Sequence, residues 1–228
     1  MTTTTSYFKP KLIVFDWDGT LLDSTGAISS AIQDAAKDLD LPVPTRQQAS
    51  HVIGLALGQA LQQAIPEVTA VQLPELIERY KHHYFKRDSD LHPFEGIPEL
   101  LDQLGSMNLP LAIATGKSHI GLMRALESLN WRRRFAATRC ADQGNPKPHP
   151  WMLLDICEEL GIAPSDTLMI GDTTHDLGLA LNAGAASIAV SYGAHSGDDF
   201  ERFKPLAITD SVSELSALLL QMLADSKR

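Results

Sequence analysis

Two aspartates separated by a single residue, Asp16 and Asp18, follow a short apolar run near the start of this chain. Carboxylates this close together repel each other unless a cation or a proton lies between them. Hard divalent cations such as Mg²⁺ prefer oxygen ligands and often use one or two carboxylates together with the phosphate of a substrate. The pair therefore indicates a site for a divalent cation.

A second acidic pair, Asp172 and Asp176, lies in the segment Gly-Asp-Thr-Thr-His-Asp. The two acids are one helical turn apart, so both carboxylates can face the same point at the start of a helix. Either acid alone could simply cap that helix. Four acids at the ends of two predicted strands favour a functional site over two caps.

Two further motifs could bind phosphate. Thr115, Gly116 and Lys117 are predicted to join a strand to the N-terminus of a helix, where a hydroxyl, backbone N–H groups and the helix dipole suit an anion. Lys147 stands between prolines, which stiffen the chain just where a helix is predicted to begin. Taken alone, the first motif is also typical of a turn, and Lys147 of a solvated loop.

Strand and helix alternate over most of the chain. Residues 11–16 form an apolar run that is typical of a buried parallel strand. We expect further strands over residues 109–115, 135–138, 167–171, 186–190 and 206–208, and helices over 96–104, 118–129, 150–160, 175–182 and 212–223. This alternation predicts an α/β fold with a Rossmann-like, doubly wound parallel sheet. Ligands bind beyond the carboxyl ends of the strands in such sheets, so Asp16, Thr115 and Asp172 should meet at one edge.

Residues 24–90 have a different pattern, with apolar residues at helical spacing and no convincing strand. Prolines separate the segments in which we expect helices, which are residues 27–39, 55–64 and 73–85. The chain should therefore form two domains. Residues 1–22 and 91–228 are expected to make the catalytic core, and residues 23–90 an inserted, all-helical cap domain.

The composition narrows the class of protein. Of the 228 residues, 44% are hydrophobic and 21% charged, which argues against disorder of the whole chain. The net charge of −9 argues against a nucleic-acid partner, but not against a phosphorylated one, because a bound cation reverses the local field. The two cysteines, Cys140 and Cys157, are too few for a disulfide framework and indicate reduced thiols in the cytoplasm.

We expect neither a targeting signal nor a membrane anchor in this sequence. We expect no membrane association, because no apolar run approaches the roughly 20 residues of a membrane span. The polar N-terminal segment has neither the basic nor the apolar region of a secretory signal. Nothing in the sequence indicates an oligomeric state.

In order and spacing, the four motifs resemble those of the haloacid dehalogenase superfamily of phosphohydrolases. The matching segments are Asp16-Trp-Asp-Gly-Thr-Leu21, Ala114-Thr-Gly-Lys117, Lys147-Pro-His-Pro150 and Gly171-Asp-Thr-Thr-His-Asp176. Trp17 stands where the family more often has phenylalanine. Residues 23–90 look like the small α-helical cap of the phosphoglycolate phosphatase-like branch.

The resemblance implies a covalent mechanism that depends on Mg²⁺. Asp16 would attack phosphorus and form an aspartyl-phosphate. Asp18 would protonate the leaving oxygen and then activate the water that hydrolyses this intermediate. The side chain of Asp16, the backbone carbonyl of Asp18 and the carboxylate of Asp172 would bind Mg²⁺.

The resemblance also implies how phosphate is held. Thr115, the amide of Gly116 and Lys147 would contact the phosphate oxygens and offset the charge that develops on them. Asp176 would support the metal site or orient Lys147. In the cap, the loop that begins at His51 and contains Gly54 resembles the family's loop that faces the active site. His51 could contact the substrate, or it could be a surface histidine without such a role.

The same motifs separate the branches of the superfamily. The dehalogenases lack the second aspartate, so Asp18 argues against dehalogenation. A phosphonatase would need a cap lysine in an apolar setting, and Lys37, Lys81 and Lys86 are not in such settings.

Three functions stay open on the sequence alone. The first is a Mg²⁺-dependent phosphatase for a small phosphorylated metabolite, with phosphoglycolate as the single best candidate. The second is a phosphomutase or diphosphatase of the same superfamily. A mutase must keep water from the aspartyl-phosphate, whereas a phosphatase must admit it. The third is a regulatory module without catalysis, although the full set of Asp16, Asp18, Lys147 and Asp172 argues against it.

Overall fold

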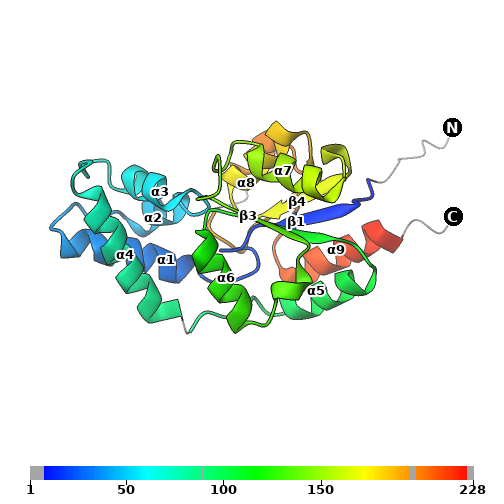
Figure 1. Ribbon diagram of the computed structural model, residues 1–228, viewed down its shortest axis with the longest axis horizontal. Helices are drawn as coiled ribbons and strands as arrows, with labels where there is room; N and C mark the ends of the chain where they lie inside the picture. The colour runs from blue at the N-terminus through cyan, green and yellow to red at the C-terminus, as the bar shows by residue number, and fades with distance from the viewer. Residues whose placement is uncertain (1–7, 89, 196–198, 225–228) are drawn as a thin grey trace.

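The computed structural model describes residues 8–88, 90–195 and 199–224. Within these residues, six parallel strands form one sheet in the order β3-β2-β1-β4-β5-β6 (Figure 1). The strands are β1 (Leu12–Phe15), β2 (Leu111–Thr115), β3 (Ala137–Cys140), β4 (Thr167–Gly171), β5 (Ala186–Val190) and β6 (Ala207–Thr209). The chain runs outward from β1 to β3 and then crosses over to β4 on the other side of β1, which makes the fold Rossmann-like and doubly wound, as predicted.

Strand β1 lies at the centre of the sheet because all four of its side chains are apolar and can be buried on both faces. Its last residue, Phe15, is in register with Ile113 of β2 on one side and Ile170 of β4 on the other. The three strands therefore end at nearly the same level. The residues that follow them come together at one edge of the sheet.

Helices cover both faces of the sheet (Figure 1). On one face, α5 (Ile97–Ser106), α6 (His119–Ser128) and α9 (Val212–Ala224) share a hydrophobic core with Phe15. On the other face, α7 (Trp151–Leu160) and α8 (Thr174–Ala183) share a core with Val14. Alternate residues of β1 thus contribute to opposite layers.

Four helices lie together beyond the carboxyl edge of the sheet, at one end of the molecule (Figure 1). They are α1 (Thr25–Asp38), α2 (Arg46–His51), α3 (Leu57–Ala64) and α4 (Leu73–Asp88), and we call them the helical insert. The insert has a hydrophobic cluster of its own, with Ile32, Leu61 and Leu76 fully buried in it. It is joined to the sheet by the chain before α1 and the chain after α4.

Most expected elements are present, with shifted ends. Helix α2 was not expected, although the box formed by Thr45 and Gln48, each capping the backbone of the other, is a helix-start signal. The strand expected over residues 135–138 begins two residues later, because Arg132–Arg134 form a 3₁₀ turn and Phe135 packs into the core before the strand begins. Among the described residues, no helix is both long and apolar enough to cross a membrane.

Candidate active site

The carboxyl edge of the sheet brings together the residues that follow β1, β2 and β4. Asp16 follows β1, Thr115 ends β2 and Asp172 follows β4, and each side chain is almost completely buried. Lys147 reaches the same place from the loop between β3 and α7, and its side chain is also buried. These residues span about 150 positions of the sequence, and the parallel register is what places them side by side.

Three buried carboxylates form a cluster at this edge. Ligand oxygens of Asp16, Asp172 and Asp176 all lie within 4.8 Å of one another. The Nζ atom of Lys147 donates to Oδ1 of Asp16 at 2.6 Å and to Oδ1 of Asp176 at 2.5 Å. One buried lysine therefore supplies the counter-charge for three buried acids.

Burial dominates the ionisation of this cluster. It raises the pKa of Asp16 well above its usual value, although the charge of Lys147 opposes that shift. It also raises the pKa of Asp172, to about 7, and the neighbouring Asp176 adds to this effect. For Lys147, burial lowers the pKa, but the two acids raise it by more, so the ammonium stays charged.

The acidic cluster fits a divalent cation. The Oδ2 atom of Asp16 is buried and accepts no hydrogen bond from the described residues. A buried carboxylate oxygen without a partner is costly, so it indicates a ligand that completes the site. Oxygen donors with excess negative charge are what Mg²⁺ prefers, and Asp16 and Asp172 offer them here.

Asp172 is held in place by groups on two loops. Its Oδ1 accepts the hydroxyl proton of Thr20 at 2.7 Å, and its Oδ2 accepts the backbone N–H of Ala194 at 2.7 Å. Two glycines make room for it, since a Cβ added to Gly19 or Gly193 would lie 2.2 Å from Oδ2. The orientation of this carboxylate is thus fixed before any cation binds.

Asp176 is bound at both oxygens. Its Oδ2 accepts the backbone N–H and the hydroxyl of Thr173, which also caps helix α8, while its Oδ1 accepts from Lys147. The helix cap and the lysine contact are therefore two parts of one arrangement. Asp176 connects the start of α8 to the ammonium group that contacts Asp16.

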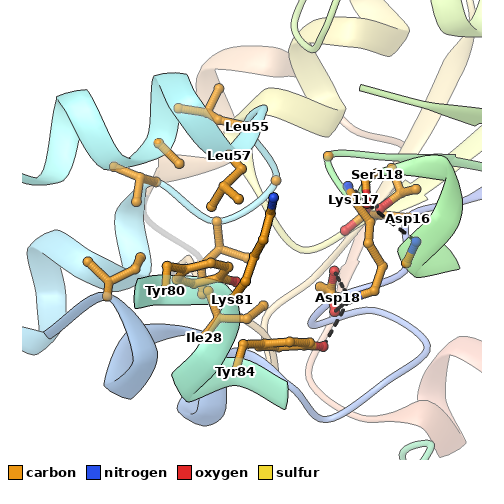
Figure 2. Close-up of a pocket in the computed structure, with 18 of the residues that line it drawn as sticks. Asp16, Asp18, Ile28, Leu55, Leu57, Tyr80, Lys81, Tyr84, Lys117 and Ser118 are labelled. Atoms are coloured by element: carbon orange, nitrogen blue, oxygen red, sulfur yellow. Dashed lines mark hydrogen bonds and ion pairs between the residues drawn. The ribbon is translucent and has the colours of Figure 1, made fainter. Parts of the chain in front are cut away.

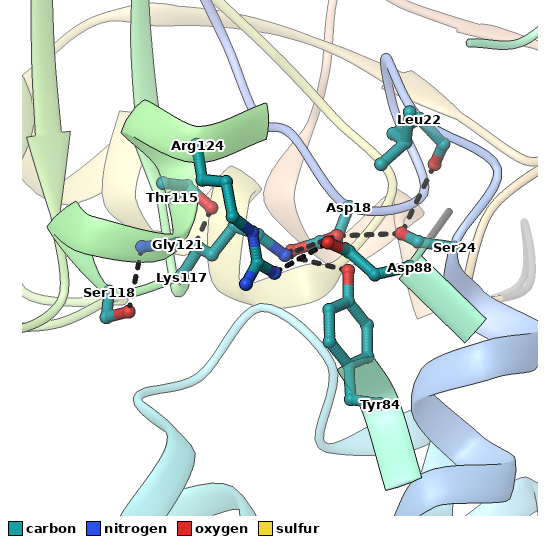
Figure 3. A network of polar contacts seen from close by, with 10 residues as sticks. All are labelled: Asp18, Leu22, Ser24, Tyr84, Asp88, Thr115, Lys117, Ser118, Gly121 and Arg124. Carbon is teal, nitrogen blue, oxygen red and sulfur yellow. Dashed lines mark hydrogen bonds and ion pairs between the residues drawn. The ribbon is translucent and has the colours of Figure 1, made fainter. Parts of the chain in front are cut away.

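Asp18 is not part of the acidic cluster and lies among Ser24, Lys117 and Tyr84, the last of which belongs to the helical insert (Figure 3). Its Oδ1 accepts from the hydroxyl of Ser24 at 2.8 Å, and the Nζ of Lys117 lies 3.4 Å from both carboxylate oxygens. The same Nζ donates to the hydroxyl of Tyr84 in α4 at 2.9 Å. Asp16 thus lies in a cluster of carboxylates with Lys147 as its counter-ion, whereas Asp18 lies outside that cluster, beside Lys117 and Ser24.

A cavity of about 390 Å³ lies between the carboxyl edge and the helical insert (Figure 2). Asp16, Asp18, Thr115 and Gly116 line it on the side of the sheet. The loop of the insert before α3 closes one side, and Gly116 permits its approach. A Cβ at Gly116 would lie 2.5 Å from the carbonyl oxygen of Gly54.

A histidine cluster joins the insert to the edge beside this cavity. The exposed ring of His51 stacks on the buried ring of His195, with centroids 4.5 Å apart. The N–H of Thr174 donates to Nδ1 of His195, so the proton of this ring is on Nε2, which donates to the carbonyl of His51 at 3.0 Å. Burial lowers the pKa of His195 to about 4, and His51 does not line the cavity.

Comparison with known proteins identifies the family. A model of haloacid dehalogenase-like hydrolases matches residues 13–190, which is most of the chain. The chain belongs to the haloacid dehalogenase-like hydrolase family. It is an enzyme of that family, and the segments that carry the resemblance in the sequence lie within the matched range.

Relatives and a solved structure of similar length agree with this family assignment. A protein of Dickeya dadantii (strain 3937) named probable phosphatase IndB is 35% identical over 210 residues, which are 90% of this chain and 91% of that protein. The phosphoglycolate phosphatase of Aliivibrio fischeri (strain ATCC 700601 / ES114) is 30% identical over 92% of this chain and 96% of its own. A hydrolase of Pseudomonas syringae has a crystal structure similar to this fold, with a TM-score of 0.84 and 25% identity over 92% and 97% of the two chains.

The sequence assigns no role to several residues that the structure places in the site of this haloacid dehalogenase-like hydrolase. Thr20 and Ser24 position Asp172 and Asp18, although Thr20 is only a member of the first motif and Ser24 belongs to none. Ala194 contributes only its backbone N–H, which no side chain reveals. Lys117 belongs to a recognised motif, but its contacts are with Asp18 and Tyr84.

Proposed function

We propose that this enzyme is a Mg²⁺-dependent phosphatase that hydrolyses a small phosphate monoester through an aspartyl-phosphate on Asp16. The observation that carries the proposal is the Oδ2 atom of Asp16, which is buried without a hydrogen-bond donor at the end of the cavity. An oxygen in this state is available as a nucleophile or as a metal ligand. The names of the relatives, which include probable phosphatase and phosphoglycolate phosphatase, support the same reaction.

The reaction would proceed in two displacements. Asp16 attacks phosphorus, the ester oxygen leaves with a proton from Asp18, and the phosphoryl group stays on Asp16. Asp18 then takes a proton from water, which attacks the aspartyl-phosphate and releases inorganic phosphate. The contacts of Asp18 with Ser24 and Lys117 hold its carboxyl at the cavity, where a leaving group would lie.

The positive and hydrogen-bonding groups around Asp16 would bind the phosphate. We assign the hydroxyl of Thr115, the amide of Gly116 and the ammonium of Lys147 to the phosphate oxygens, because all three lie at this edge. The carboxylates of Asp16 and Asp172 and the backbone carbonyl of Asp18 would hold Mg²⁺. When bound, Mg²⁺ supplies positive charge that offsets the negative charge of phosphate and carboxylates.

We further propose that residues 23–90 form a cap domain that closes over the phosphate site, with residues 1–22 and 91–228 as the catalytic core. The separate hydrophobic cluster of the helical insert supports this division. So does the position of Gly54, whose carbonyl lies against Gly116 at the edge of the site.

The substrate class follows from charge and from the relatives. We propose a small phosphorylated metabolite rather than a nucleic acid, because the net charge of −9 opposes a polyanion. The name of the Aliivibrio fischeri relative makes phosphoglycolate the first compound to test. We place the enzyme in the cytoplasm, where Cys140 and Cys157, both free and buried, would stay reduced.

The proposal is tested by hydrolysis of an aryl phosphate with and without Mg²⁺. Asp16→Asn should abolish turnover while its circular dichroism spectrum stays that of the wild type, because the amide is nearly isosteric but not nucleophilic. Asp166→Asn, which changes a half-exposed acid paired with Lys11 far from the site, is the matched control and should keep full activity. Wild-type turnover in Asp16→Asn would refute the covalent mechanism.

A further inference from the structure

The cavity has two chemically different walls (Figure 2). Asp16, Asp18 and Lys117 lie on the side of the sheet, whereas the helical insert builds the opposite wall from apolar and aromatic side chains together with Lys81. That wall includes Ile28 and Ile32 of α1, Ile53 and Leu55 of the loop between α2 and α3, Leu57 at the start of α3, and Tyr80 of α4. A phosphate at Asp16 would therefore direct its leaving group toward apolar surface.

The aromatic part of the wall is ordered and uncharged. Tyr80 stacks on Tyr84, with ring centroids 5.9 Å apart and planes 18° apart. Burial raises the pKa of both hydroxyls above the usual value, so the two rings stay neutral at any physiological pH. Phe85 of α4 and Ile120 of α6 also line the cavity and are 50% and 82% exposed. Exposed apolar side chains that line a cavity are suited to an apolar ligand.

Each cationic side chain that lines the cavity already has an acidic partner. Lys117 lies 3.4 Å from Asp18, and Arg124 donates to Asp88 at 2.6 Å. Lys81 donates to Glu78 at 2.7 Å in an exposed pair. A carboxylate on the leaving group, such as that of phosphoglycolate, would have to displace one of these partners or remain unpaired against apolar side chains.

The volume of the cavity also favours a leaving group larger than that of phosphoglycolate. At about 390 Å³ the cavity falls in the range of about 300–1,000 Å³ that holds drug-sized ligands, which is far more than a two-carbon leaving group fills. An aromatic ring or a branched alkyl group would occupy the space between Leu57 and Tyr80. Its burial would stabilise the complex in proportion to the apolar area removed from water.

We propose that the natural substrate is a phosphate monoester with an uncharged, apolar leaving group that contains a ring or a branched alkyl chain. The inference rests on the proposed phosphatase function, which it narrows. It assigns Leu57 and Tyr80 as specificity-determining residues that contact the leaving group. It also sets phosphoglycolate aside as the preferred substrate of this chain.

The test is a series of monoesters of primary alcohols, whose leaving groups have similar intrinsic reactivity. The esters are ethyl phosphate, butyl phosphate, 2-phenylethyl phosphate and phosphoglycolate. The value of kcat/KM should rise about fourfold for each buried methylene, and it should be at least about 100-fold higher for 2-phenylethyl phosphate than for ethyl phosphate. Phosphoglycolate should be no better than ethyl phosphate, and a kcat/KM for phosphoglycolate above that for 2-phenylethyl phosphate would overturn the inference.

Substitutions in the cavity wall test which residues make the enzyme prefer an apolar leaving group. Leu57→Ala should lower the ratio of kcat/KM for 2-phenylethyl phosphate to that for ethyl phosphate about tenfold or more, since it removes three apolar carbons from the wall. The matched control is Val71→Ala, which trims an exposed residue of the insert outside the cavity and should not change this ratio. If Lys81→Met lowers kcat/KM for the best ester tenfold, the leaving group is held by charge and the inference is wrong.

A binding measurement separates this inference from the phosphatase proposal. Ethylphosphonate and 2-phenylethylphosphonate cannot be hydrolysed at an ester bond, so calorimetry with the Mg²⁺-loaded wild type reports binding alone. Tighter binding of the phenylethyl compound without hydrolysis of any ester would support the apolar site and refute the phosphatase function. Hydrolysis of all esters at equal rates, with equal binding of the two phosphonates, would support the phosphatase function and refute the apolar site.

Discussion

The Nζ atom of Lys147 lies 2.6 Å from Oδ1 of Asp16, although 131 residues separate the two in the sequence. The same atom donates to Oδ1 of Asp176, and all three side chains are buried. The lysine is therefore an internal counter-ion of the acidic cluster. We expect its charge to stabilise the fold around the site and, under the proposed function, to attract a phosphate dianion.

Replacing this cation should destabilise the protein. Lys147→Met keeps much of the side-chain volume but leaves Asp16 and Asp176 without their counter-charge, and breaking a buried ion pair in this way costs about 3–5 kcal/mol. Urea unfolding at pH 7 measures the loss. Lys11→Met, which removes an exposed lysine paired with Asp166, should cost no more than about 1 kcal/mol. Equal losses in the two variants would show that Lys147 has no such structural role.

Mg²⁺ should stabilise the folded enzyme through Asp172. Binding to the folded state alone adds about 2.7 kcal/mol at a Mg²⁺ concentration 100 times Kd, so Tm should rise with added metal. The protection should be larger at pH 8 than at pH 6. Because the pKa of the metal-free Asp172 is raised to about 7, protons compete with Mg²⁺ for this carboxylate at the lower pH.

The variant Asp172→Asn tests this assignment. The amide keeps the shape of the carboxyl but loses its charge, so Mg²⁺ should no longer raise Tm. In Asp166→Asn, which leaves the acidic cluster unchanged, the protection should persist. Undiminished protection in Asp172→Asn would place the cation elsewhere.

The position of the helical insert should change when one methyl group is added to Gly116 at the edge of the sheet. In Gly116→Ala the new Cβ would lie 2.5 Å from the carbonyl oxygen of Gly54 and 2.6 Å from that of Leu55. Both contacts are with backbone, so the loop must move away from the phosphate site, and kcat/KM should fall at least tenfold. Steady-state kinetics with any hydrolysed monoester measures this.

A second glycine provides the control for that variant. Gly105 lies in α5, and a Cβ there meets no atom within 4 Å. Gly105→Ala should keep full activity and raise the free energy of unfolding by about 0.5–1 kcal/mol, because alanine is the better helix former. If Gly116→Ala is as active as Gly105→Ala, the insert does not need its close approach to the sheet.

The sequence predicts the sheet and the places of Asp16, Thr115 and Asp172 well because these depend on local patterns. An apolar run that ends in an acid identifies a buried strand and its carboxyl end, and parallel strands then share an edge. The orientation of each acid, by contrast, cannot be predicted from local patterns. It depends on partners such as Thr20 and Ser24, and on backbone groups such as the N–H of Ala194, which meet the acids only in the folded chain.

In the helical insert, too, the sequence predicts local elements but not the contacts between distant segments. Helical spacing predicts three of its helices, while the short helix α2 is marked only by its box of Thr45 and Gln48. The contact of His51 with His195 joins residues 144 positions apart. It is set by the docking of the insert on the sheet, for which neither segment carries a pattern.

His195 should make the stability of the enzyme depend on pH between 7 and 5. Burial lowers its pKa in the folded state to about 4, whereas the unfolded value is about 6.5. Its neutral ring therefore contributes stability that is fully present above pH 6.5 and is lost as the pH falls through about 4. By pH 5 the loss is about 2 kcal/mol, which urea unfolding of the metal-free protein at pH 7, 6 and 5 measures.

The variant His195→Gln separates this effect from other titrations. Glutamine cannot ionise, so the variant should lose less stability than the wild type over the same pH range, whatever its stability at pH 7. The free energy of unfolding of this variant should still fall somewhat with pH, because burial also lowers the pKa of the neighbouring His175. Burial is the main reason that His195 resists protonation, and the N–H of Thr174, which donates to its Nδ1, would face the proton of a charged ring. Identical slopes in wild type and variant would mean that His195 can take up a proton without disturbing this contact between the insert and the sheet.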